Sequence, residues 1–164
     1  MKNRKLMALI GIIFATGIFL FWSSLAQEEP SDAPEINENK VTVYKSPYCG
    51  CCDNYVIYLE EQGFQVKAIN TWNLSSIKEK YQIPPNMQSC HTSVIGGYFI
   101  EGHVPIEAIE KLLAEKPDID GIALPGMPVG SPGMPGLKTE AFKIYAVSDG
   151  TISEFMSDAL HEGG

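Results

Sequence analysis

The segment VTVYKSPYCGCC, residues 41–52, decides the fold prediction, because a strand pattern ends within it and a cysteine cluster begins. Its first four residues show the alternating, β-branched pattern of a strand, and the next four break that pattern. Residues 53–62 are then typical of a helix. Cys49, Cys51 and Cys52 therefore lie where a strand leads into a helix N-terminus. Free backbone N–H groups and the helix dipole stabilise thiolates at such a position.

The segments that follow predict an α/β fold of thioredoxin type. We expect a strand at 64–69, a helix at 74–81, strands at 93–95 and 98–101 joined by a Gly-Gly turn, and a helix at 106–116. The first two strands are joined by a helix and should be parallel, whereas the later two form a hairpin and should be antiparallel. This β-α-β-α-β-β-α order is the thioredoxin or glutaredoxin layout.

The same layout places the fourth cysteine, Cys90, beside the other three. The loop before the hairpin faces the first cysteine loop in this fold, so Cys90 should join the cluster despite its distance in sequence. Thioredoxins carry a cis-proline in that loop. Here Pro84 and Pro85 come several residues too early, and residues 90–92 occupy its place.

The composition changes after residue 116. Residues 124–136 are nearly all Pro, Gly and Met, which is typical of a linker. Met127 and Met134 are unusual there, and they either pack over another part of the protein or offer thioether sulfur. The pattern at 142–155 predicts a β-hairpin at the edge of the sheet. We assign residues 41–136 to the thioredoxin-like domain and 137–164 to a C-terminal hairpin extension and tail.

The N-terminus predicts export from the cytoplasm. A short basic segment precedes a run of apolar or small residues at 6–22, and residues 24–26 resemble a small-x-small cleavage site. We interpret residues 1–26 as a signal peptide or, alternatively, as an uncleaved anchor, since the run is long for a signal and short for a full span. Either way, the body is expected in the periplasm or another extracytoplasmic compartment, in contact with a membrane only through this segment.

The charge balance excludes a nucleic-acid partner. The first 26 residues contain three of the 12 basic residues and none of the 20 acidic ones, so removing them changes the net charge from −8 to −11. Such a body repels phosphate. Residues 27–40 combine prolines and acidic residues with almost no apolar side chain, which is typical of a solvated acidic linker.

The cysteine cluster favours a soft metal ion. Cys49 and Cys52 have the C-x-x-C spacing of thiol–disulfide enzymes, but that chemistry needs two thiols, so Cys51 and Cys90 are in excess. Thiolates select Cu(I), with Zn and iron–sulfur clusters as competitors. The paired knuckles of a Zn site and the wider spacing of iron–sulfur motifs are absent from the sequence. Copper, as Cu(I), is therefore the first choice on ligand type for the three or four thiolates crowded here.

Other side chains are weaker candidates. His103 is a possible ligand, a residue that orients a ligand, or a structural residue. His91 adjoins Cys90 and is a ligand or a hydrogen-bonding partner of the loop. Met127 and Met134 are auxiliary ligands at most, with packing as the preferred role. Glu101 lacks a second carboxylate nearby in the sequence, so we assign it no acid–base role.

Two other functions stay open at this point. The first is an exported thiol–disulfide oxidoreductase that uses Cys49 and Cys52. The second is a structural module with two disulfides or a Zn ion, which the oxidising compartment favours. Neighbouring Cys51 and Cys52 oppose the disulfide version, because a bond between adjacent cysteines is strained.

Residues 41–136 resemble the CopG-type family of exported metal-binding proteins, which is associated with copper resistance. The matching motifs are Cys49-Gly50-Cys51-Cys52, Ser89-Cys90-His91-Thr92, Gly97-Tyr98 with Glu101-Gly102-His103-Val104-Pro105, and PGMPVGSPGM at 125–134. The resemblance implies a thioredoxin-like fold, a periplasmic copper site or multi-copper cluster on the four cysteines, and a role in copper redox handling alongside other copper-handling proteins. Tyr55 stands where the family often has Trp, which should alter packing and not ligation.

Overall fold

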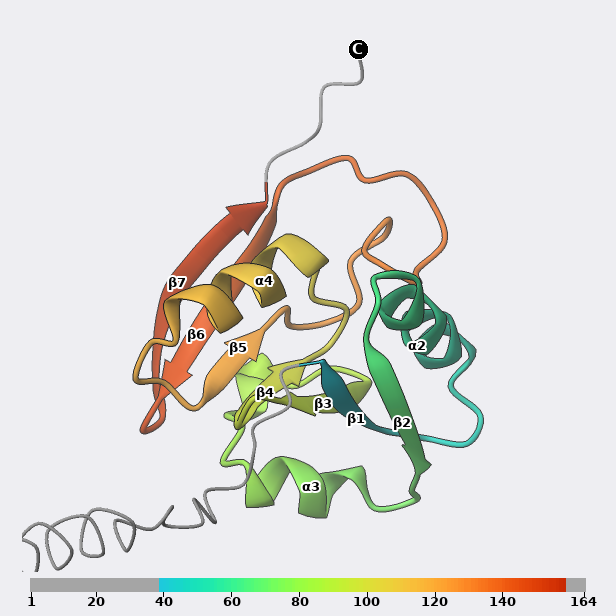
Figure 1. Ribbon diagram of the computed structural model, residues 1–164, viewed down its shortest axis with the longest axis horizontal. Helices are drawn as coiled ribbons and strands as arrows, with labels where there is room; N and C mark the ends of the chain where they lie inside the picture. Colours follow the sequence, from blue (N-terminus) through green and yellow to red (C-terminus); the bar gives the residue numbers. More distant parts are fainter. Residues whose placement is uncertain (1–38, 159–164) are drawn as a thin grey trace, which may run out of the picture. The chain divides into compact units, whose positions relative to one another are not determined.

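A seven-stranded sheet is the centre of the computed structural model, which describes residues 39–158 (Figure 1). The strands follow the order β2-β1-β3-β4-β5-β6-β7. Their bounds are β1 Lys40–Lys45, β2 Gln65–Asn70, β3 His91–Ile95, β4 Tyr98–Glu101, β5 Gly121–Ala123, β6 Phe142–Ser148 and β7 Thr151–Asp158. The helices of this part of the chain are α2 Gly50–Glu61, α3 Leu74–Lys80 and α4 Ile106–Glu115, with a 3₁₀ turn, η1, at Pro85–Met87.

The strand pairing confirms the predicted thioredoxin-like arrangement. β1 and β2 run parallel, with Val41 opposite Val66, because α2 carries the chain back before β2 begins. β3 is antiparallel to both β1 and β4. The predicted order β-α-β-α-β-β-α is therefore present from β1 to α4.

The C-terminal hairpin continues the same sheet, as predicted, through a strand that the sequence did not predict. β5 is parallel to β4 and antiparallel to β6, so it joins the hairpin β6–β7 to the thioredoxin-like strands. With three residues, including Gly121, β5 is too short to show an alternating pattern. Gly121 lies opposite Phe99, and a Cβ atom at this position would overlap the Phe99 carbonyl oxygen and ring.

Helices cover both faces of the sheet. α2 and α4 lie on one face and α3 on the other (Figure 1). The first face holds the main apolar cluster, in which Leu59 and Leu112 pack with strand residues such as Ile100. Phe99, the neighbour of Ile100 in β4, belongs to a second cluster with Met87. The side chains of successive strand residues thus point to opposite faces of the sheet, as the pleat of a β-strand requires.

Two local differences from the prediction concern the cysteines. α2 begins at Gly50 and not at residue 53, so Cys51 and Cys52 form part of its first turn. β3 begins at His91 and not at residue 93, so Cys90 directly precedes a strand. Within residues 39–158 every peptide bond is trans, so Cys90 and its neighbours occupy the position of the thioredoxin cis-proline without sharing its geometry.

Several predictions lie outside the described residues. These are the signal peptide or anchor at 1–26, most of the linker at 27–40, and the tail after residue 158. Within the part that the structure describes, none of the helices has the length and apolarity that a membrane span requires.

Gly121→Ala should destabilise the protein, because the added methyl group has no space against Phe99 in the paired strand β4. We expect the free energy of unfolding to fall by about 2 kcal/mol, the scale of overpacking in a core. Chemical denaturation measures it. Gly50→Ala is the control, since a Cβ there has no neighbour within 4 Å. Equal stability of the two variants would contradict the packing of β5 on β4.

Candidate metal centre

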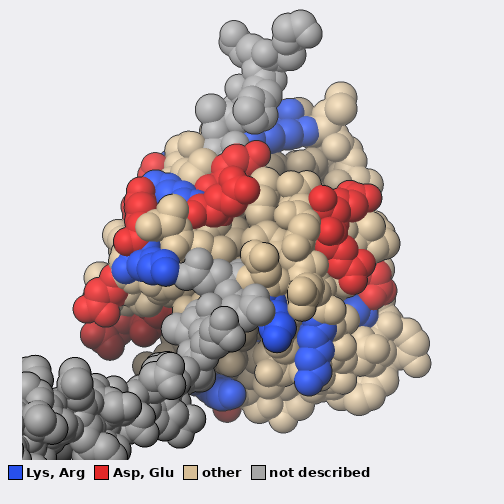
Figure 2. Space-filling model, in the orientation of Figure 1, with Lys and Arg blue, Asp and Glu red and all other residues tan. Residues whose placement is uncertain are grey.

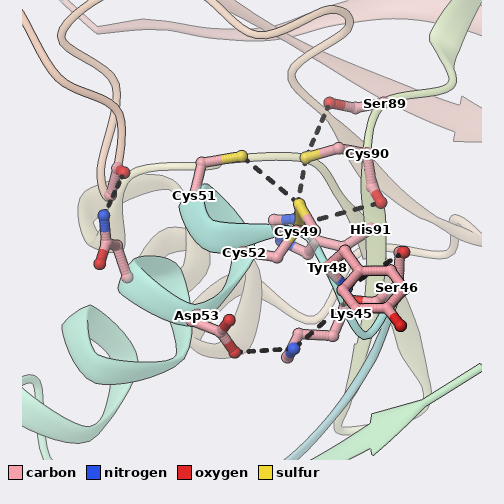
Figure 3. The surroundings of a disulfide bond; sticks show 12 residues. Lys45, Ser46, Tyr48, Cys49, Cys51, Cys52, Asp53, Ser89, Cys90 and His91 are labelled. Carbon is pink, nitrogen blue, oxygen red and sulfur yellow. Dashed lines mark hydrogen bonds and ion pairs between the residues drawn. A yellow bond between two sulfur atoms is a disulfide. The ribbon is translucent and has the colours of Figure 1, made fainter.

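The four cysteines meet at the N-terminus of α2. Their sulfur atoms all lie within 4.8 Å of one another. Cys49 and Cys52 form a disulfide, whereas Cys51 and Cys90 are free thiols (Figure 3). The predicted approach of Cys90 to the other three cysteines is therefore observed, although 38 residues separate it from Cys52.

Local backbone structure fixes the three clustered cysteines. Cys49 is the N-cap of α2, and its carbonyl oxygen accepts hydrogen bonds from the N–H groups of Cys52 and Asp53, each at 3.1 Å. Cys52 is fully buried and Cys51 half-buried. The Cys51 thiol lies 3.4 Å from the Cys49 sulfur. Lys45 forms an ion pair of 2.7 Å with Asp53, which ties the end of β1 to the first turn of the helix.

Two histidines contact the sulfur of Cys90. His103 Nε2 lies 3.1 Å from Cys90 Sγ, and its Nδ1 lies 2.7 Å from the carbonyl oxygen of Pro132. When Nδ1–H donates to that carbonyl, Nε2 presents its lone pair to the cysteine. His91 Nδ1 lies 3.4 Å from the same sulfur. Cys90, His91 and His103 thus form a second group of potential ligands that shares one cysteine with the first.

Burial keeps both imidazoles neutral. It lowers the pKa of His103, against an opposing effect of the Pro132 carbonyl, and lowers the pKa of His91 well below its ordinary value. His91 Nε2 is buried without a hydrogen-bond partner among the described residues. Adjacency to a cysteine in the sequence does not show which way an imidazole points, so the contact of His91 with the Cys90 sulfur could not be predicted from the sequence alone.

The ring of Tyr55 packs against the imidazole rings of both histidines. Its ring centroid lies 4.6 Å from that of His91 and 5.3 Å from that of His103. Its hydroxyl donates to the Val104 carbonyl at 2.8 Å. Burial raises the pKa of this phenol well above its ordinary value, so it stays a neutral hydrogen-bond donor. The residue therefore acts in packing, on the buried side of α2.

The loop 124–136 lies against the site. Asn54 in α2 donates to the carbonyl of Gly133 at 3.3 Å, and Ser89 Oγ donates to the carbonyl of Gly126. Gly133 has φ +77°, and a Cβ there would lie 2.7 Å from the backbone nitrogen of Tyr55. Met127 is exposed and Met134 half-buried. The loop is thus held over α2, and a thioether ligand from either methionine stays a prediction.

The donor set matches a soft cation. Burial, reinforced by the neighbouring Cys51, raises the pKa of the Cys90 thiol to about 11, because a thiolate there would be poorly solvated and close to another sulfur. The negative charge of the cluster is therefore limited in two ways, by the disulfide between Cys49 and Cys52 and by the proton on Cys90. A soft cation can take the place of the proton and, once the disulfide is reduced to two thiolates, of that bond as well, because thiolate sulfur and neutral imidazole are ligands that copper accepts.

Comparison with known proteins gives the class of this site. A family model described as "Protein of unknown function, DUF411" matches residues 87–134. Two solved structures, named copper resistance protein copG forms 1 and 2, are 39% and 40% identical, with TM-scores of 0.68 and 0.67. The matches cover 73% and 72% of this chain, and 97% and 96% of those chains. No curated protein matches the chain.

The fold and the clustered cysteines define a thioredoxin-like protein with a potential metal centre at the end of its first strand. The chain belongs to the CopG family of copper resistance proteins. The resemblance inferred from the motifs is confirmed, and with it a copper-related function in general terms.

The raised pKa of Cys90 predicts a pH-dependent stability of the metal-free protein. The folded pKa of about 11 exceeds the value of about 8.5 expected for an unfolded cysteine. The neutral thiol therefore contributes stability that is fully present below about pH 8.5 and is lost as the pH rises towards about 11. Denaturation midpoints across this range measure it. Cys90→Ser is the control and should show a flatter profile; identical profiles would contradict the assignment.

Proposed function

We propose that this chain is an exported copper-binding protein of copper homeostasis, which holds Cu(I) with its cysteine sulfurs. The observation that carries the proposal is the convergence of four cysteine sulfurs within 4.8 Å. Its solved relatives are named copper resistance proteins, which supports copper over other soft metals. Cys49, Cys51, Cys52 and Cys90 are the proposed ligands, with His103, Met127 and Met134 as weaker candidates.

The Cys49–Cys52 pair can give the site a source of electrons for copper when it is in its reduced, dithiol form. When Cys49 and Cys52 are reduced, four thiols face one another, and soft sulfur favours Cu(I). Oxidation of those two thiolates to the disulfide releases two electrons, which reduce two Cu(II) ions to two Cu(I) ions. Two equivalents of an external thiol, which leave as their own disulfide, or another two-electron reductant restore the dithiol. The proposed reduction of Cu(II) to Cu(I) is therefore balanced, with the chain as electron carrier. An external one-electron oxidant returns each Cu(I) to Cu(II) and completes the proposed cycle.

Charge favours a cationic cargo. On the face shown in Figure 2, acidic side chains gather over α2 and over α4. Negative potential raises the local concentration of cations and repels anionic ligands. We further propose that the protein acts outside the cytoplasm and exchanges copper with other copper-handling proteins there.

A thiol–disulfide oxidoreductase is the second candidate, and the observed disulfide between Cys49 and Cys52 is what favours it. The free thiol of Cys51 opposes it, because it lies 3.4 Å from Cys49 Sγ, where it can compete for the disulfide. This candidate predicts turnover of a disulfide substrate that survives Cys51→Ser and Cys90→Ser. Loss of turnover in both variants would leave copper binding as the better account.

Anaerobic Cu(I) titration of the fully reduced protein, followed by native mass spectrometry, tests the main proposal. We expect at least one tightly bound Cu(I) per chain. Cys51→Ser or Cys90→Ser should each weaken binding by at least about tenfold, because each removes a soft ligand. The protein with its Cys49–Cys52 disulfide intact is the matched control and should bind more weakly. Absence of binding with all four thiols reduced would overturn the function.

A further inference from the structure

A buried carboxylate lies behind Cys90 and has no part in the metal chemistry described so far. Glu101 is the last residue of β4 and is completely buried. It lies directly opposite Thr92 of β3 in the strand register. Two residues further along the chain is His103, whose imidazole touches the Cys90 sulfur. The carboxylate and this imidazole therefore project from the same strand end.

The contacts of Glu101 flank Cys90 on both sides. Its Oε1 accepts a hydrogen bond of 2.6 Å from the backbone N–H of Ser89, the residue before Cys90. Its Oε2 accepts one of 2.6 Å from the hydroxyl of Thr92, two residues after Cys90. One carboxylate thus fixes the backbone before the cysteine and the side chain after it.

Lys78 supplies the counter-charge. This lysine is in α3, is 6% exposed, and forms an ion pair with Glu101 Oε1. Its ammonium also lies 3.3 Å from Thr92 Oγ1. A buried ion pair of this kind is weak evidence for stability, because apolar side chains of similar volume often stabilise a core as well or better. The pair therefore calls for a reason other than stability.

We propose that Glu101, held by Lys78, is a positioning residue that keeps the Cys90 sulfur inside the four-sulfur cluster. The inference rests on the proposed copper function only in saying why that position matters. Cys90 precedes β3 and lacks regular structure of its own, so its place depends on the residues around it. A charged acceptor suits this task, since hydrogen bonds to a charged group are stronger than those between neutral partners.

Close backbone packing supports the same role. Gly102, which links Glu101 to His103, has φ +79°, and a Cβ there would lie 2.8 Å from the Ser89 side chain. Its N–H donates to the carbonyl of His91 at 3.1 Å. Three consecutive residues at the end of β4 therefore contact the Cys90 loop. They are Glu101 through its carboxylate, Gly102 through its backbone and His103 through its imidazole. A shift of this strand end moves the cysteine with it.

Glu101→Gln tests the proposal in metal-free protein that retains its Cys49–Cys52 disulfide, so that only Cys51 and Cys90 react with an alkylating agent. Because the loop loses its charged acceptor, we expect Cys90 alkylation to accelerate by about fivefold or more, while Cys51 stays within about twofold and serves as the internal control. Peptide mass spectrometry measures both rates. Glu115→Gln, which breaks an exposed ion pair on α4, should change neither.

Cu(I) affinity of the reduced variant is the second readout. We expect it to fall by about tenfold, the usual effect of losing a residue that orients a metal ligand. If the wild-type protein binds no Cu(I) but Glu101→Gln still accelerates Cys90 alkylation, the positioning role is supported and the copper function is contradicted. If the wild type binds Cu(I) and folded Glu101→Gln matches it in both readouts, the positioning role falls and the copper function stands.

Two further variants apply if Glu101→Gln does not fold, because it leaves the Lys78 ammonium buried without a counter-charge. Lys78→Met combined with Glu101→Gln removes both charges. Thr92→Val keeps both charges and removes the hydroxyl, which donates to Glu101 Oε2 and accepts from the Lys78 ammonium. If Cys90 is alkylated faster in either variant while the rate at Cys51 is unchanged, the result supports the proposal. If the ratio of the Cys90 rate to the Cys51 rate is unchanged in both variants, and both have a native circular dichroism spectrum, the proposal is overturned.

Discussion

Crowding of sulfur is the constraint on which the structure of this site depends. Four cysteine sulfurs lie within 4.8 Å of one another, and thiolates that close repel each other strongly. Their charge can be removed by a covalent bond, by a proton or by a cation. In this structure the covalent bond joins Cys49 and Cys52, and burial raises the pKa of the Cys90 thiol to about 11, which favours the proton there. A soft cation is the third way, and the two neutral histidines at Cys90 suit it because they add no charge of their own.

The sheet explains why this crowding is possible. Cys90 reaches the cluster because β3 lies beside β1 in the sheet, which sets the residue before β3 next to the residues after β1. The extension through β5 to β7 serves the same region. The connection 124–141, which includes the loop 124–136, runs from β5 to β6, so both of its ends are fixed in the sheet while Pro132 and Gly133 contact the site. A segment with the composition of a linker thereby becomes part of the wall of the centre.

Local patterns in the sequence predict the strands and α-helices up to residue 116, apart from the exact starts of α2 and β3 and the short turn η1, and topology then places Cys90. The remaining features depend on contacts that no local pattern contains. β5 is too short for periodicity, and Lys78 reads as an ordinary surface lysine until α3 is placed over β3. Glu101 was assigned no acid–base role for lack of a second carboxylate, whereas its partners are a lysine, a hydroxyl and a backbone N–H. The pairing of Cys49 with Cys52 reflects oxidation state, which a sequence does not encode.

The first turn of α2 has a consequence for how the protein changes state. The N–H groups of Cys52 and Asp53 are bonded to the Cys49 carbonyl oxygen, so backbone hydrogen bonds already join the two residues that the disulfide links. Opening the disulfide therefore leaves the helix start in place and frees only the two sulfur atoms. The chain closed by the bond spans just three residue steps, so little conformational entropy is regained. Oxidised and reduced forms should accordingly present the same surface to a partner and differ only inside the site.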